Sequence, residues 1–130
     1  MHELKQANKV WNRACLNPVR ILPGDRALSD LNRAHGLVMN GGVLHAIECL
    51  NANELAEAQS GYRYFGFDTV AYLLSRAKTI LETGDDLGFH EGQLDKQYAS
   101  IIRDDSALAD RFEKHLLSNP SEYAPISAKG

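Results

Sequence analysis

Apolar residues recur every three or four positions along most of this 130-residue chain. That spacing places them on one face of an α-helix, whereas a half-buried strand would alternate apolar and polar residues. No segment shows the alternation of a strand, so we expect an all-α protein. The predicted helices cover about 2–16, 25–39, 41–51, 53–65, 69–83, 93–103 and 106–118. They form a single compact domain of six or seven helices over residues 1–126, and residues 127–130 are expected to fray as a tail.

The segment Asn40-Gly41-Gly42 predicts a sharp corner between two helices. Two adjacent glycines weaken a helix interior by about 1 kcal/mol each, but they suit a junction that needs backbone freedom. Asn40 is a candidate N-cap for the helix that follows. That helix, about 41–51, is apolar on most sides, which is typical of a buried helix. We therefore expect it to be central, with the rest of the chain packed around it.

Other helix ends are predicted from capping residues. Residue types that cap helix N-termini precede three predicted helices: Asp25, Asn53 and Asp68. Glycines suited to the left-handed conformation follow two of them: Gly66 and Gly84. Residues 84–92 lack a regular pattern and are expected to form an irregular segment.

Charge is distributed unevenly along the chain. Residues 1–40 hold six Lys or Arg and three Asp or Glu, residues 41–95 hold three and nine, and residues 96–130 hold five of each. The three net charges of +3, −6 and 0 sum to the overall −3. An acidic middle argues against direct nucleic-acid binding, because phosphates require a basic surface. It suits a protein partner with a basic surface instead.

Composition adds a few limits. Hydrophobic residues make up 44% of the chain and charged residues 24%, as in an ordinary globular protein, and no apolar run is long enough to span a bilayer. The first residues lack the features of a signal peptide, so a cytoplasmic location is expected. Cys15 and Cys49 lie in apolar, helix-like contexts and are expected to be buried free thiols.

The sequence contains no recognisable catalytic or metal-binding signature. His45 and Glu48 could face one ligand, but no His-Glu-x-x-His pair is present and the order needed for a di-iron bundle is reversed. We predict no metal, no cofactor and no catalytic residue. The alternative is a small-molecule-binding protein or enzyme with a pocket near His45 and Glu48, lined by the aromatic residues of 62–67.

A set of motifs resembles a family of small bacterial proteins whose named member is a DNA-mimic protein. The set begins with Asn40-Gly41-Gly42 ahead of an apolar helix and extends roughly over residues 30–123. It continues with Gly61-Tyr62-Arg63-Tyr64-Phe65-Gly66, the helix segment 70–77, Leu94-Asp95 with Tyr98, and 112–116 before Tyr123. The chain departs from the family at 43–46, where aromatic residues and Gln are usual.

The resemblance implies an all-α fold and a non-catalytic role in binding a partner protein. The named member presents acidic side chains as surrogate phosphates to a DNA-binding regulator. By this analogy we expect an inhibitor or regulator of a basic partner, either DNA-mimic-like or immunity- or antitoxin-like.

Seven carboxylates are the candidate partner-binding face. If the helices near 53–65 and 69–83 pack antiparallel, the end of the second returns toward the start of the first. Acidic side chains at a helix C-terminus are unfavourable by about 0.3–1 kcal/mol each, which suggests a reason other than stability for Glu82, Asp85 and Asp86. The predicted acidic face consists of Glu54, Glu57, Glu82, Asp85, Asp86, Glu91 and Asp95.

Overall fold

The structure, a computed structural model, describes residues 2–16, 20 and 22–125, with side chains from residue 7 onward. Within that part of the chain it contains seven α-helices, one short 3-10 helix and no strand, which confirms the all-α fold. The helices are α1 (His2–Leu16), α2 (Pro23–Gly41), α3 (Val43–Cys49), α4 (Ala52–Tyr64), α5 (Asp68–Thr83), α6 (Leu87–Ile101), α7 (Asp105–Ser118) and η1 (Pro120–Glu122). The expected tail at 127–130 lies outside the described residues.

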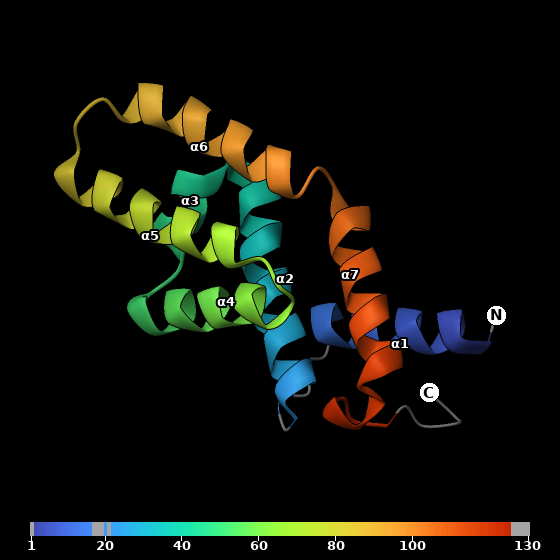
Figure 1. The fold of residues 1–130 in the computed structure, drawn as a ribbon. Helices are drawn as coiled ribbons and strands as arrows, with labels where there is room; N and C mark the ends of the chain where they lie inside the picture. The colour runs from blue at the N-terminus through green and yellow to red at the C-terminus, as the bar shows by residue number, and fades with distance from the viewer. Residues whose placement is uncertain (1, 17–19, 21, 126–130) are drawn as a thin grey trace.

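The long helix α2 connects the two ends of the molecule (Figure 1). It packs against α1, α3, α4 and η1, and ten of its residues are buried. At one end, α4 and α5 run antiparallel and α6 returns across α5 and α3. At the other end, α7 descends beside α1.

The predicted buried helix is α3. It lies between α2, α5 and α6, and Val43, Leu44, Ala46 and Ile47 are all buried. Its burial explains the apolar run after the two glycines, because three neighbouring helices cover most of its sides.

Four predicted N-caps are wrong in detail. Helix α2 continues through Asn40 to Gly41, and α2 begins early enough to include Asp25 in its first turn. Asp68 is likewise inside α5 rather than ahead of it. The cap of α4 is Asn51, not Asn53: the Asn51 side chain accepts from the Glu54 N–H, and the Glu54 side chain accepts from the Asn51 N–H. This reciprocal capping box explains the start of α4.

The two glycine stops are confirmed, but the irregular segment is shorter than predicted. Gly66 and Gly84 have φ of 85° and 74°, as the left-handed ends of α4 and α5 require. Helix α6 begins at Leu87, so most of 84–92 is helical. Glycines lower the intrinsic preference of this segment for helix, but burial of Leu94 and Tyr98 fixes α6 on the core.

The prediction of two buried thiols is also wrong. Cys15 and Cys49 are free, as expected, but both are exposed, because each lies beside rather than on the buried face of its helix. No described helix is long and apolar enough to cross a membrane.

Candidate partner-binding surface

The start of α4, the end of α5 and the start of α6, from which most of the predicted acidic residues come, lie at the same end of the molecule (Figure 1). The antiparallel packing of α4 and α5 brings these three points together, as the sequence argument required. The seven carboxylates are not equivalent, however. Three have side-chain or backbone partners within the described part of the chain, and the other four have none there.

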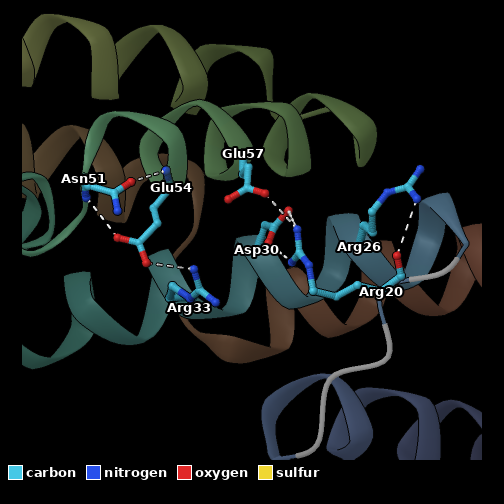
Figure 2. Close-up of polar contacts among 7 residues, drawn as sticks. All are labelled: Arg20, Arg26, Asp30, Arg33, Asn51, Glu54 and Glu57. Carbon is cyan, nitrogen blue, oxygen red and sulfur yellow. Dashed lines mark hydrogen bonds and ion pairs between the residues drawn. The ribbon is translucent and has the colours of Figure 1, made fainter.

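Glu54 holds together the start of α4 and the middle of α2 (Figure 2). One carboxylate oxygen accepts from the Asn51 N–H at 3.0 Å, and the other accepts from Arg33 at 3.1 Å. Both contacts stabilise the fold, and the positive charge of Arg33 partly neutralises the Glu54 carboxylate.

Glu57 takes part in a second ion-pair group on the same two helices (Figure 2). The Arg20 guanidinium donates to both oxygens of Asp30 and to Glu57, the latter at 2.9 Å. Asp30 is buried, so Arg20 supplies the charge that a buried carboxylate requires. Hydrogen bonding to Asp30 raises the pKa of Arg20 further. One cation thus ties two acids from α2 and α4.

Asp95 supplies the cap that the sequence assigned to Asn40. Its carboxylate, on α6, accepts from the Val43 N–H at 2.8 Å and so caps the first turn of α3. Gly42, with φ of 95°, allows this approach, because an added Cβ would lie 2.9 Å from an Asp95 oxygen. The Asn-Gly-Gly corner therefore serves to join α2, α3 and α6.

The remaining four carboxylates form what we term the acidic turn: Glu82, Asp85, Asp86 and Glu91. All four are exposed, and among the described residues none of them forms an ion pair or a side-chain hydrogen bond. Residues 79–95 contain no Lys or Arg. The negative charge at this end is thus uncompensated over the whole of that segment.

The helix-dipole argument holds for Glu82 but not for the two aspartates. Because α6 begins at Leu87, Asp86 is its N-cap residue and Asp85 immediately precedes it. A negative charge at a helix N-terminus is favourable, which offsets the unfavourable end of α5.

Two further features mark the acidic turn. Asp86 has φ of 51° and is the one non-glycine residue with positive φ in the described chain. Phe89, in the first turn of α6, is 64% exposed. Exposed aromatic side chains are typical anchors of protein interfaces.

One contact bears on the alternative prediction of a pocket near His45 and Glu48. The Cys49 sulfur lies 3.6 Å from His45 Nε2, a thiol–imidazole pair that the sequence analysis missed although the spacing is i, i+4. Three pockets identified on the described surface, between α1 and α7, α2 and α4, and α1 and α2, are not lined by His45 or Glu48. No group of three or more potential metal ligands occurs among the described residues.

Sequence reasoning also missed a polar chain that links four helices and is buried except at Asp105. Tyr62 and Tyr98 hydroxyls lie 2.6 Å apart, the Tyr98 hydroxyl is 2.8 Å from His35 Nδ1, and His35 Nε2 is 2.7 Å from Asp105. The signal in the sequence was polar His35 on the apolar face of α2.

Comparison with known proteins decides the family. The model of the family described as DMP19-like protein matches residues 20–124. The chain belongs to the DMP19-like family. The matched segment contains the acidic turn and α2 to α7, whereas α1 precedes it. The resemblance to a DNA-mimic family is therefore confirmed. No curated protein and no solved structure matches the chain.

Proposed function

We propose that this protein is a non-catalytic regulator that binds a DNA-binding protein through the acidic turn. The carboxylates of the turn would stand in for phosphates on the basic surface of the partner. Family membership supports the class of partner. The observation that carries the choice of surface is that Glu82, Asp85, Asp86 and Glu91 are exposed and have no ion-pair partner among the residues that the structure describes.

The division of the seven acids is the main argument. Glu54, Glu57 and Asp95 are engaged by Arg33, Arg20 and the Val43 N–H, so their loss would disturb the fold. The side chains of the acidic turn form no hydrogen bond or ion pair among the described residues, and its four charges lie within ten residues. Uncompensated charge of one sign raises the local potential and steers association with a basic surface.

Phe89 and Asp86 add to the proposal. The Phe89 ring is exposed in the free protein and would lose its contact with water when a partner binds. The carboxylates around it would then form a charged rim, which is the usual arrangement of a protein interface. A left-handed aspartate costs about 1–3 kcal/mol of local strain, which is commonly found at functional positions. A cytoplasmic location is part of this proposal, because a DNA-binding partner would be met there.

The test is a paired capture experiment. The full-length protein and its Asp85→Lys, Asp86→Lys variant are used as baits, and proteins retained only by the unmodified chain are identified by mass spectrometry. We expect a DNA-binding protein, which duplex DNA of a length covering its site should displace competitively.

The matched control carries the same change in charge elsewhere. Asp68→Lys with Asp110→Lys alters two exposed aspartates away from the acidic turn. We expect this variant to retain the partner. If both double variants lose the partner equally, only the net charge of the protein matters. If the Asp85→Lys, Asp86→Lys variant still retains the partner, the acidic turn is not the binding surface.

A further inference from the structure

A small pocket lies between α1 and α7. Figure 1 shows these two helices on the opposite side of the molecule from the turn that joins α5 and α6. Its volume is about 200 Å³. Cofactor and drug-sized sites usually have about 300–1,000 Å³. The pocket is therefore suited to a single side chain rather than to a whole small molecule. Its lining includes Ala7, Asn8 and Trp11 from α1 and Asp105, Phe112 and Glu113 from α7.

The lining combines aromatic rings with carboxylates and includes no Lys or Arg. Trp11 is half-buried and packs on the buried Phe112, with ring centroids 5.8 Å apart. Asp105 and Glu113 come from the same helix, α7, two turns apart. Asp105 has a 78% exposed side chain, and its Oδ1 is engaged by His35. The carboxylate is thereby fixed in position while most of its surface faces solvent.

The basic side chains adjoining this lining in sequence do not belong to it. Lys9 follows Asn8 and Lys114 follows Glu113, and both are exposed and are not part of the lining. Arg111 donates to the Phe65 carbonyl at 2.8 Å and lies 4.8 Å from the centre of the Phe67 ring. The charge of the lining is accordingly −2 without a cation in the lining to neutralise it.

We propose that this pocket binds the guanidinium group of an arginine side chain presented by a protein partner. A planar cation stacks on an aromatic face, most favourably on tryptophan, and its N–H fork pairs with carboxylates. Trp11 would supply the face, and Asp105 with Glu113 would accept the N–H groups. This site is independent of the acidic turn and of the proposed DNA mimicry.

Part of the pocket wall, supplied by α1, lies outside the segment that the family model matches. The match to the DMP19-like family covers residues 20–124, so Ala7, Asn8 and Trp11 lie outside it. Without α1 the α7 carboxylates would have no aromatic wall opposite them.

Trp11 is the single tryptophan, so its fluorescence reports on this pocket alone. The full-length protein is titrated with a blocked Gly-Arg-Gly peptide, with its neutral citrulline analogue and with its lysine analogue. We expect a saturable change with the arginine peptide, weaker binding of the lysine peptide and no saturable change with citrulline. An equal response to arginine and citrulline, equal affinity for arginine and lysine, or no saturation with arginine would overturn the proposal.

Variants separate specific contacts from net charge. Glu113→Gln should raise the Kd of the arginine peptide about fivefold, the size expected for loss of one partly exposed charge contact. Asp105→Asn, which keeps an oxygen acceptor for His35, should have a similar effect. Asp110→Asn removes an equal charge from α7 outside the pocket and should leave the Kd unchanged. Circular dichroism checks that each variant is folded, and unchanged affinity in folded Glu113→Gln and Asp105→Asn would refute the assignment.

Discussion

At the residue scale, the hydroxyl of Tyr98 is the centre of the buried polar chain. It contacts both Tyr62 and His35, and each of these three side chains is buried. If Asp105 accepts the Nε2 proton of His35, Nδ1 is an acceptor, so Tyr98 donates to His35 and Tyr62 donates to Tyr98. A single hydroxyl therefore satisfies two other buried groups.

We expect Tyr98→Phe to lower the free energy of unfolding by about 1–3 kcal/mol, because it leaves buried partners unsatisfied. Urea denaturation followed by circular dichroism measures the change. Tyr72→Phe is the control, since the Tyr72 side chain is 65% exposed. If Tyr98→Phe is as mild as Tyr72→Phe, the chain of hydroxyls does not contribute to stability.

Tyrosine ionisation predicts how stability depends on pH. Burial raises the pKa of Tyr62, Tyr64, Tyr98 and Tyr123 above the ordinary value, with nearby acids adding to the effect at Tyr64 and Tyr123. The folded state thus keeps these phenols protonated after the unfolded chain has begun to lose its protons. Their contribution is complete below the unfolded pKa of about 10 and is lost as the pH rises above it.

Unfolding measured between neutral and strongly alkaline pH should show this loss. We expect the free energy of unfolding to fall steadily above about pH 10. The slope should be shallower in Tyr98→Phe, because one fewer phenol takes part. A stability that stays constant through this range would show that the four phenols titrate alike in both states.

Residue-level prediction from sequence worked where a local pattern decided the outcome. Gly66 and Gly84 were found because a left-handed helix end demands glycine, and α3 was found because its apolar run is unusually complete. Asp95 was missed as a cap, since its partner at Val43 is 52 residues away. The engaged roles of Glu54 and Glu57 also depend on arginines from another element, which no spacing rule reveals.

At the element scale, α2 and α4 are joined by two ion-pair groups of different burial. Asp30 in the Arg20 group has an 8% exposed side chain, whereas both partners in the Arg33–Glu54 pair are at least one third exposed. An exposed pair contributes little, while removal of the partner of a buried charge is costly. The two arginines therefore differ in their contribution to this helix pair, although both bind acids of α4.

We expect Arg20→Ala to destabilise the protein by roughly 2–3 kcal/mol, below the value for a fully buried pair because Arg20 is one third exposed. Arg33→Ala, the matched variant, should cost less than about 1 kcal/mol. Thermal and urea unfolding of the Arg20→Ala and Arg33→Ala variants measure the two losses in the free energy of unfolding. Adding Asp30→Asn to Arg20→Ala should recover part of the loss, and no recovery would argue against a stranded charge as the cause.

On the scale of the whole molecule, internal pairing changes how the sequence charge should be interpreted. The basic first third is partly neutralised, because Arg13, Arg20 and Arg33 bind carboxylates from α2 and α4. Asp25 also accepts from the Ala124 N–H, which ties the end of the described chain to α2. The modest net charge of −3 thus conceals an acidic turn whose carboxylates form no ion pair with any residue that the structure describes.

This distribution predicts salt-dependent association with the captured partner. The association rate constant should fall as ionic strength rises, because charges separated by more than about 8 Å are screened at physiological salt. In Asp85→Asn with Asp86→Asn we expect both a lower rate constant at low salt and a smaller dependence on salt. Asp68→Asn with Asp110→Asn removes equal charge elsewhere and should retain most of the dependence. Stopped-flow or surface-based kinetics at several salt concentrations distinguish these outcomes, and identical slopes for the two double variants would assign the steering to net charge rather than to the acidic turn.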